Sequence, residues 1–333
     1  MTRPRILSGM RPTGPLHLGH LTGALDNWVR LQDEYDCFFV VVDWHALTTD
    51  YADPSAIRAN IIEVATDWLA AGLDPTRSTL FIQSLVPEHA ELHLMLSMIT
   101  PLSWLERVPT YKEQQQNLQE KDLSTYGFLG YPLLQSADII IYKADAVPVG
   151  EDQAPHVEMT REVVRRFNHL YGHVFPEPRT LLTATPRVPG TDGRKMSKSY
   201  GNSVYLKDSP EETRAKIRPM VTDPARKRRT DPGNPEICPV FDLHKAFSTP
   251  ETRAWAAEGC RTAGIGCLDC KGGLLDHLLR RVSEIHGRRA EFASRPDTVW
   301  DILKTGSVRA REVARATMEE VRRAMRISYS DQA

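Results

Sequence analysis

The chain has 333 residues, 41% of them hydrophobic, and its 42 basic side chains balance 43 acidic ones. This composition suits a globular protein with a sizeable core and excludes a disordered or globally basic chain, so any basic surface has to be local. The longest apolar run, "CFFVVV" at 37–42, is far too short to cross a bilayer, and "MTRPRILSGM" lacks the apolar stretch of a signal peptide. We therefore expect a cytoplasmic protein without a membrane partner.

Residues 1–202 alternate between strand and helix patterns. Short apolar runs predict buried strands, and amphipathic stretches between them predict helices. This alternation favours an α/β fold, a doubly wound parallel sheet that binds ligands at the carboxyl ends of its strands. The expected strands lie at 5–9, 37–43, 79–84, 145–150 and 180–185, and the expected helices at 17–32, 53–72 and within 150–172.

Two departures from this rhythm suggest the domain organisation. Residues 86–137 are polar and helical in pattern and include "YKEQQQNLQEKD" at 111–122, so we expect an insertion between the halves of the sheet. After about residue 203 the strand pattern stops, and Ser209, Pro210 and Glu212 form a helix-start signature with a capping box. We therefore predict an α/β domain at 1–202, with its helical insertion, and a helical domain at 203–333.

The first strand leads into a Gly/Pro-rich turn that opens a helix, "SGMRPTGPLHLGH" at 8–20. The positive partial charge of a helix start suits an anionic phosphate, and the absence of a side chain at Gly19 allows a flat ring to approach closely. His17 and His20 can donate hydrogen bonds to phosphate oxygens. Taken alone, the segment is equally typical of a capped helix with two surface histidines. The chain has no GxxxxGK[ST] sequence, which excludes a P-loop enzyme.

A second motif, "GRKMSKSYGN" at 193–202, follows the last expected strand. Lys195 and Lys198 lie three residues apart in a loop with glycines on both sides. Two ammonium groups on such a loop can stabilise the charge that develops on a transferring phosphate. Read alone, the segment is also typical of a solvated Lys/Ser loop.

Together, "HLGH" and "KMSKS" resemble the class I aminoacyl-tRNA synthetases, and most closely the bacterial type of tryptophanyl-tRNA synthetase, over nearly the whole chain. Three further stretches carry the resemblance: "VVVDWHALTTDY" (40–51), "YPLLQSADIIIY" (131–142) and "VPVGEDQAPHVEMTREVVRRFN" (147–168). The tyrosine-specific relatives differ at the equivalent of "VPVGEDQ". The resemblance implies a Rossmann-like catalytic domain and a helical anticodon-binding domain. It also implies ATP-dependent activation of L-tryptophan, transfer to tRNA(Trp), Mg²⁺ accompanying ATP, and a homodimer built through the insertion.

The resemblance also implies roles for individual residues. Asp138 is expected to accept the indole N–H of tryptophan, since that group is only a donor and needs an acceptor. Tyr131 and Gln153 are expected to hold the ammonium and carboxylate groups, with His45 lining the pocket. Arg11 stands where many members have glutamine, and we expect it to reach an ATP phosphate. The implied catalytic residues are His17, His20, Lys195 and Lys198. The implied ATP-binding residues are Arg11, Pro12, Thr13, Gly19, His20, Gly150, Glu151, Asp152, Val188, Lys195, Met196, Ser197, Lys198 and Ser199.

Basic clusters in the helical half are candidate contacts to tRNA phosphates. They are "RKRR" at 226–229 and the pairs Arg280–Arg281 and Arg288–Arg289. Each is also the pattern of an ordinary solvated helix face.

Four of the five cysteines are gathered between residues 238 and 270, with the spacing C-x₂₁-C-x₆-C-x₂-C. In a reducing compartment, such clustering favours a metal over disulfides. Zinc ribbons usually show two CxxC knuckles and this chain shows one, while the Cys–Pro pair at 238–239 matches a ligand of bacterial ferredoxins. A subset of tryptophanyl-tRNA synthetases carries a 4Fe–4S cluster on similarly arranged cysteines. The resemblance therefore implies a 4Fe–4S cluster, with Zn²⁺ as the alternative, on Cys238, Cys260, Cys267 and Cys270.

Three other functions are compatible with these patterns. The chain can be a tyrosine-specific class I synthetase, which amino-acid-dependent pyrophosphate exchange would distinguish. It can be an RNA-binding paralogue without catalysis, against which the intact "HLGH" and "KMSKS" motifs argue. It can also be a metal-dependent sensor in which synthetase chemistry is secondary.

Overall fold

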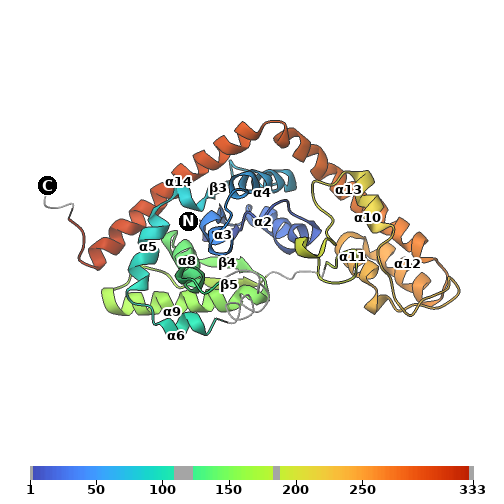
Figure 1. Cartoon of the computed structure of the whole chain (residues 1–333), viewed down its shortest axis with the longest axis horizontal. Helices are drawn as coiled ribbons and strands as arrows, with labels where there is room; N and C mark the ends of the chain where they lie inside the picture. Colours follow the sequence, from blue (N-terminus) through green and yellow to red (C-terminus); the bar gives the residue numbers. More distant parts are fainter. Residues whose placement is uncertain (1–2, 109–122, 183–187, 330–333) are drawn as a thin grey trace.

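Five parallel strands form one sheet at the centre of the molecule (Figure 1). The computed structural model describes residues 3–108, 123–182 and 188–329. The strand order is β3-β2-β1-β4-β5, which is the doubly wound parallel sheet expected from the alternation of patterns. The strands are β1 (Arg5–Met10), β2 (Asp36–Val41), β3 (Ser78–Ile82), β4 (Ala146–Val149) and β5 (Arg179–Leu182). The expected continuation of the last strand to 185 lies outside the described residues.

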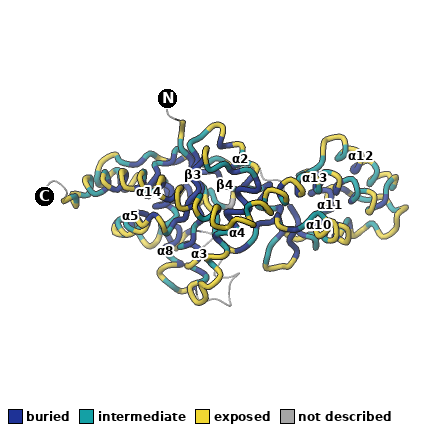
Figure 2. Tube along the Cα trace, turned by 90° about the horizontal axis from the view of Figure 1, so that it is seen from above, coloured by how far each residue is buried: buried dark blue, intermediate teal, exposed yellow. Residues whose placement is uncertain are grey.

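Both faces of the sheet are covered by helices, because β2 and β3 are apolar and buried on both sides. Along β2, Cys37, Phe39 and Val41 belong to one buried cluster, whereas Phe38 and Val40 belong to the other. The first cluster also takes in α4 and parts of the helical C-terminal region, and the second takes in α5, α8, α9 and α14. Figure 2 shows this buried centre as the dark tube around β3 and β4.

The helices of the α/β region lie largely where the sequence predicts them. The helix expected at 53–72 begins later, at Ile57, and ends at Gly72, which takes a left-handed conformation with φ of 118°. The segment expected at 86–137 contains α5, α6 and the start of α8, while 111–122 lies outside the described residues. The bounds are α3 (Asp43–Asp50), α4 (Ile57–Ala71), η2 (Gln83–Leu85), α5 (Glu88–Ser97), α6 (Leu102–Glu106), α8 (Tyr126–Ile141), η3 (Glu151–Gln153) and α9 (Ala154–Tyr171).

The helix expected at 17–32 is correct in position but not regular. It consists of α1 (Leu18–His20), a π-helical turn η1 (Leu21–Leu25) and α2 (Asp26–Leu31). A π-turn inside a helix is rare and often marks a functional site. Here it shifts the register of the residues that follow the "HLGH" turn.

The C-terminal region is helical, as the sequence predicts. Ser209 and Glu212 form the expected capping box at the start of α10. Two long helices, α13 and α14, run across the top of the molecule and meet at an angle (Figure 1). The elements are η4 (Lys198–Tyr200), α10 (Pro210–Ile217), η5 (Pro235–Ile237), α11 (Pro239–Phe247), α12 (Pro250–Arg261), α13 (Cys267–Ala293) and α14 (Pro296–Ala324).

Helix α14 returns to the sheet and covers the edge strand β3. A Cβ added at Gly306 would lie 1.9 Å from the carbonyl oxygen of Leu80, so only glycine fits at this contact. The Ile82 N–H donates to Ser307 Oγ at 3.2 Å, which satisfies an edge group that would otherwise be open to another strand. Within the described residues, no helix has both the length and the apolar character needed to span a membrane.

Candidate functional site

A cleft of about 610 Å³ opens at the carboxyl ends of β1 and β4. This is where the strand order reverses, since the chain builds outward from β1 through β2 and β3 before β4 pairs on the other side of β1. Its walls come from β1, the helix after it, α3, α8, β4 and η3. Eight residues predicted from the sequence line it: Arg11, Gly19, His20, His45, Tyr131, Asp138, Gly150 and Gln153.

Backbone N–H groups of the turn hold both histidines of "HLGH" in a fixed tautomer. His17 Nδ1 accepts from the Gly19 N–H at 3.1 Å, and His20 Nδ1 accepts from the His17 N–H at 3.2 Å. Since both Nδ1 atoms are acceptors, the proton of each neutral ring is on Nε2. Burial, together with the charge of Lys198, lowers the pKa of His17 to about 4. Burial and the neighbouring His17 lower that of His20 to about 3. Both rings are therefore neutral donors at pH 7, suited to phosphate oxygens.

The lysine loop folds onto the turn that precedes "HLGH". Lys198 Nζ donates to the carbonyl oxygens of Gly14 at 2.8 Å and Thr13 at 3.1 Å. Burial lowers the pKa of Lys198 to about 8, although the charge of Asp67 opposes the shift. The two motifs are thus joined in space, with one ammonium group already at the turn.

Asn202, which the sequence analysis did not single out, shapes this loop. Its side chain accepts from the Ser197 N–H at 2.9 Å and donates to the Lys195 carbonyl oxygen at 3.2 Å. A Cβ at Gly190 would lie 2.2 Å from the Asn202 amide, so the glycine leaves room for it. The sequence signal that could have identified Asn202 is the Gly–Asn pair that ends "GRKMSKSYGN".

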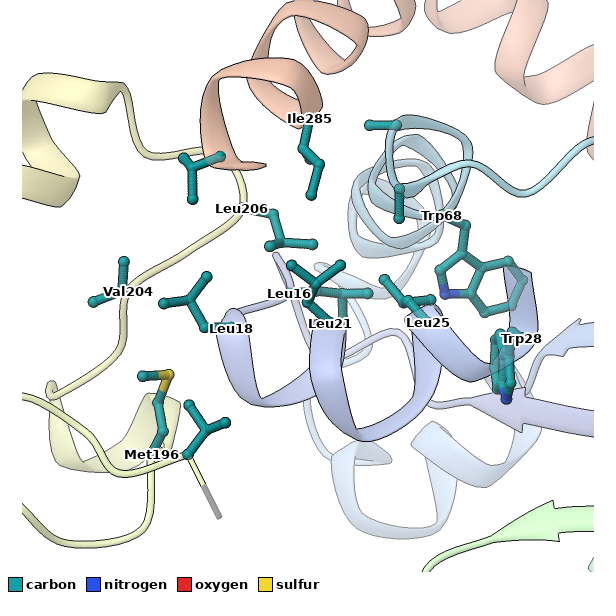
Figure 3. Close-up of a cluster of buried hydrophobic side chains, with 14 of the residues drawn as sticks. Leu16, Leu18, Leu21, Leu25, Trp28, Trp68, Met196, Val204, Leu206 and Ile285 are labelled. Atoms are coloured by element: carbon teal, nitrogen blue, oxygen red, sulfur yellow. The ribbon is translucent and has the colours of Figure 1, made fainter. Parts of the chain in front are cut away.

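The other predicted ATP-binding residues lie around the turn and the loop. Val188 and Met196 are buried and belong to the same apolar cluster. In Figure 3, Met196 faces Val204 and Leu18. Ser197 and Ser199 share a hydrogen bond of 2.9 Å. Pro12 is buried, whereas Thr13, Glu151 and Lys195 are exposed. The side chain of Asp152 lies outside the described part of the chain.

Arg11 carries a partly satisfied guanidinium at the cleft. It contacts the Thr49 hydroxyl, and Asp50 lies 4.0 Å from its Nη2. Its Nε is buried and has no hydrogen-bond partner among the described residues. Burial lowers the pKa of Arg11 from its ordinary value despite the nearby Asp50 carboxylate. A buried donor of this kind suits an anionic ligand.

Asp138 sits on the wall of the cleft and is 2% exposed. Its carboxylate accepts from His45 Nε2 at 2.9 Å, from His89 Nδ1 at 2.6 Å and from the Gln83 amide at 2.8 and 2.9 Å. Burial alone would raise the pKa of Asp138, but His89 and His45 outweigh it and hold the pKa well below its usual range. The site therefore presents a fixed anionic acceptor.

Sequence reasoning missed Gln83 and His89. Gln83 follows β3 directly, and a polar residue at the carboxyl end of a predicted strand was an available signal. His89 lies in the first turn of α5, where the local sequence gave no signal. Tyr131, which was predicted, lies 3.2 Å from His156 Nε2 through its hydroxyl, and His156 also lines the cleft.

The four clustered cysteines come together where α11, α12 and α13 begin or end. Cys238 precedes α11, Cys260 lies near the end of α12, and Cys267 and Cys270 form the first turn of α13. Burial, reinforced by the other three thiols, raises the pKa of Cys270 to about 12. As the described residues stand, no three or more His, Cys, Asp or Glu side chains form a group that could hold a metal ion.

The arginine pair at 288–289 makes contacts within the protein although Arg288 is exposed, and its contact with tRNA stays a prediction. Arg288 Nε donates to the Ala70 carbonyl oxygen at 2.6 Å. Arg289 donates to Asp67 at 2.7 Å and to Glu63 at 2.6 Å. Helix α13 packs on α4, and this contact uses both side chains. Of the other candidates, the exposed ones are Lys227, Arg228, Arg229 and Arg280.

Comparison with known proteins bears on this cleft. Residues 1–282 match the family described as tRNA synthetases class I (W and Y). A tryptophan–tRNA ligase from Thermotoga maritima is 56% identical over 98% of this chain and 100% of the relative. One from Ralstonia nicotianae is 50% identical over 98% of this chain and 99% of the relative. The tryptophanyl-tRNA synthetase from Campylobacter jejuni, solved with ADP and tryptophan, matches with a TM-score of 0.86 at 30% identity, covering 96% of this chain and 99% of that one.

Proposed function

The chain belongs to the family of class I tRNA synthetases for tryptophan and tyrosine, and from this membership we propose that it ligates L-tryptophan to tRNA(Trp) with ATP. Its relatives at 50% and 56% identity are named tryptophan–tRNA ligases and are matched over nearly their whole length. The reaction has two steps. A carboxylate oxygen of tryptophan displaces pyrophosphate from the α-phosphate of ATP, and the tryptophanyl group then passes from the adenylate to the terminal ribose of the tRNA.

One observation carries the choice of amino acid: the buried carboxylate of Asp138 on the cleft wall. A hydrogen-bond acceptor held at a fixed position rejects side chains without a matching donor far better than an apolar pocket does. Its two oxygens already accept four hydrogen bonds from three protein side chains, which fills the roughly four acceptor positions of a carboxylate. An indole N–H that reaches Asp138 therefore competes with His45, the donor that shares the cleft. Tyr131 and Gln153 are the proposed partners of the amino-acid ammonium and carboxylate.

For the ATP half we propose that binding and catalysis rest on positioning and charge. His20 donates from Nε2 to a phosphate oxygen, and Gly19 beside it leaves room for the nucleotide. Arg11 offers its unpartnered Nε to phosphate. Lys198 moves from the Gly14 carbonyl to the pyrophosphate as charge develops there, and Lys195 joins it. Mg²⁺ enters as part of the substrate, MgATP.

The remaining predicted residues complete the proposed ATP site. Gly150 and Glu151 lie at the end of β4, where they suit the ribose hydroxyls, and Val188 suits the adenine ring. Pro12, Thr13, Asp152 and Ser197 belong to the same proposed set, as do His17, Met196 and Ser199.

The test of the function is amino-acid-dependent ATP–pyrophosphate exchange with the full chain. Tryptophan is expected to support exchange, and tyrosine is expected not to. Exchange driven by tyrosine alone would overturn the assignment, and the absence of exchange with both would overturn the activity. Charging of tRNA(Trp) then tests the second step.

We also propose that the four clustered thiols hold a 4Fe–4S cluster. The donor set fits, because the four cysteines supply the number of thiolates that a 4Fe–4S cluster needs, and burial raises the pKa of the Cys260 and Cys270 thiols when no cation is bound. The surroundings fit as well: a Cβ at Gly233 would lie 2.6 Å from Cys260 Sγ, so the glycine leaves space at that sulfur. Zn²⁺ is the alternative occupant, because four thiolates also form structural zinc sites. The cluster would be structural, tying α11 and α12 to the first turn of α13.

Three further features belong to the proposal. The catalytic domain spans 1–202 with its insertion at 86–137, and the helical domain at 203–333 binds the anticodon. The protein acts in the cytoplasm as a homodimer. Exposed apolar side chains of the insertion support a second copy as the partner, with Leu94 on α5 and Met98 at its C-terminal cap exposed by 56% and 69%. Leu102 and Tyr126, from α6 and α8, are 62% and 65% exposed.

A further inference from the structure

A buried carboxylate outside the cleft connects the helical region to the "HLGH" turn. Asp67 lies on α4 and is 0% exposed. One of its oxygens accepts the backbone N–H of Leu16 at 2.7 Å, and the other accepts Arg289 Nε at 2.7 Å. Leu16 directly precedes His17, and Arg289 belongs to α13. Asp67 therefore links Leu16 to Arg289 through hydrogen bonds from both sides.

A carboxylate in this position is costly, which calls for an explanation. Burial raises the pKa of Asp67, and the charge of Arg289 and the Leu16 N–H oppose that shift. Buried ion pairs of this kind often add no net stability compared with apolar residues of the same shape. The apolar surroundings would suit a leucine or methionine here, since α4 is buried along this face. The pair therefore suggests a role in specifying geometry.

The Leu16 segment is clamped from its other side by the chain that follows the lysine loop. The Leu206 N–H donates to the Leu16 carbonyl oxygen at 2.9 Å, and the Leu18 N–H donates to the Val204 carbonyl oxygen at 3.0 Å. Figure 3 shows Leu16, Leu206 and Ile285 of α13 pointing toward one another in the same apolar cluster. Asp67 thus accepts from the backbone N–H of Leu16, while the backbone N–H of Leu206 donates to the carbonyl oxygen of Leu16.

Helix α13 makes this contact a long-range one. It begins with Cys267 and carries Arg289 near its other end. Over the 22 residues between them, a helix spans about 33 Å at 1.5 Å per residue. The same helix therefore bears two of the clustered thiols and the arginine that fixes Asp67.

We propose that Asp67 is a positioning residue for ATP, which fixes the "HLGH" turn through Leu16 and is itself held by Arg289. This inference rests on the proposed function, because it assigns the turn to ATP. Asp67 touches no reacting atom. Its effect is to keep the backbone and imidazole donors of the turn aligned with the phosphates, and misalignment by a fraction of an ångström weakens such contacts. Through Arg289 and Asp67, the helical region fixes the backbone N–H of Leu16 at this turn.

The first variant to test is Asp67→Asn. Asparagine has one acceptor oxygen where aspartate has two, so it cannot serve both the Leu16 N–H and Arg289. The Kd of ATP, measured by equilibrium dialysis without amino acid, is expected to rise on the order of tenfold. The KM for tryptophan is expected to stay unchanged, since Asp138 and its partners lie on α8, α3, η2 and α5. Thermal unfolding checks that the variant is folded.

The double variant Asp67→Asn/Arg289→Gln is the rescue. Its amides can pair with each other and leave the asparagine oxygen to Leu16, so ATP affinity is expected to recover most of the loss. Arg281→Gln is the matched control, because Arg281 is on the same helix and contacts Asp26 of α2 through an exposed pair at 2.9 Å. ATP affinity is expected to be unchanged in that variant.

Three results would overturn the proposal: unchanged ATP affinity in folded Asp67→Asn, an equal loss for ATP and tryptophan, or a double variant no better than the single one. If Asp67→Asn does not fold, Arg289→Lys replaces it, because lysine keeps the charge but cannot reach both Asp67 and Glu63 with the same fork. Unchanged ATP affinity there would equally overturn the idea. Tryptophan-dependent ATP–pyrophosphate exchange by the unaltered chain is measured in parallel. Its absence would overturn the proposed function rather than the role of Asp67.

Discussion

The carboxylate of Asp138 and the imidazole of His89 meet at 2.6 Å with exposed fractions of 2% and 0%. On its other side, His89 Nε2 lies 2.7 Å from the Tyr142 hydroxyl, and Tyr142 is fully buried as well. With the tyrosine hydroxyl donating to Nε2, the imidazole carries its proton on Nδ1 and donates it to Asp138. The hydrogen bonds from Tyr142 to His89 and from His89 to Asp138 therefore fix the carboxylate that is proposed to accept the indole N–H.

His89→Ala is expected to lower kcat/KM for tryptophan by roughly ten- to a hundredfold, because it removes a hydrogen bond to a charged group worth about 1.5–3 kcal/mol. The KM for ATP should not change, since His89 lies away from the "HLGH" turn. Pyrophosphate exchange at varied tryptophan and varied ATP measures the two effects separately. Tyr142→Phe removes only the far end of the chain and should cause a smaller loss. A change in ATP KM alone would contradict the role of His89.

Asp138→Asn tests the acceptor itself. The amide loses the charge and presents an NH₂ group to neighbours that are all donors, so at least one hydrogen bond must break. We expect a loss of about 1–3 kcal/mol in tryptophan binding, together with weaker discrimination against other amino acids. ATP affinity should survive. An unchanged kcat/KM for tryptophan would remove Asp138 from the indole site.

The partners of Asp138 also show where sequence reasoning reached its limit. The apolar runs of β1 to β4, which alternate with helix patterns, predicted a parallel sheet. Strands of such a sheet are buried on both faces and therefore read as continuous apolar runs. Asp138 could be singled out because a carboxylate between apolar residues needs a partner. Gln83 and His89 could not be identified as those partners, since they lie 55 and 49 residues away in the chain. Only the packing of α5 and η2 against α8 brings them together.

Two other features could not be predicted from local sequence patterns, because they also depend on tertiary packing. The π-helical turn at Leu21–Leu25 lies within a sequence that reads as an ordinary helix. Arg289 reads as part of a basic pair on a solvated face, but the packing of α13 on α4 turns it toward Asp67. The sequence shows that Arg289 is charged, but only the tertiary fold shows which carboxylates it contacts.

Lys198 should give the reaction a pH dependence. Burial lowers the pKa of its ammonium group to about 8. The proposed role needs the charged form, so kcat/KM for ATP, which reports on the free enzyme, should fall as pH rises through about 8. Lys198→Arg should remove that fall, because a guanidinium stays protonated, although its activity will be lower. Between pH 6 and 8 neither His17 nor His20 should contribute, since their pKa values are about 4 and 3. If Lys198→Arg shows the same fall of kcat/KM with pH, the titrating group is not Lys198.

Met98→Glu tests the proposed dimer face. If a second copy covers this residue, the substitution buries a charge without a partner, which costs about 3–5 kcal/mol. Sedimentation velocity over a range of concentrations should then show monomers where the unaltered chain is dimeric. Val308→Glu, at an α14 position that is 61% exposed, is the control and should not alter assembly. Dimers of unchanged stability in Met98→Glu would move the interface elsewhere.

The cysteine site offers a test that leaves every ligand in place. Gly233→Ala puts a Cβ about 2.6 Å from Cys260 Sγ, so the sulfur must shift from its position. Gly272→Ala is the matched control, because a Cβ there meets nothing within 4 Å although the residue lies just beyond Cys270 on α13. With protein purified without oxygen, Gly233→Ala should lower the iron and labile sulfide content and the visible absorbance, and Gly272→Ala should not. Cys267→Ser should abolish the brown colour and weaken tRNA charging while pyrophosphate exchange is largely kept, since the adenylate cleft lies on the sheet. Colourless, iron-free protein that contains zinc would exclude the cluster and establish zinc at these thiols.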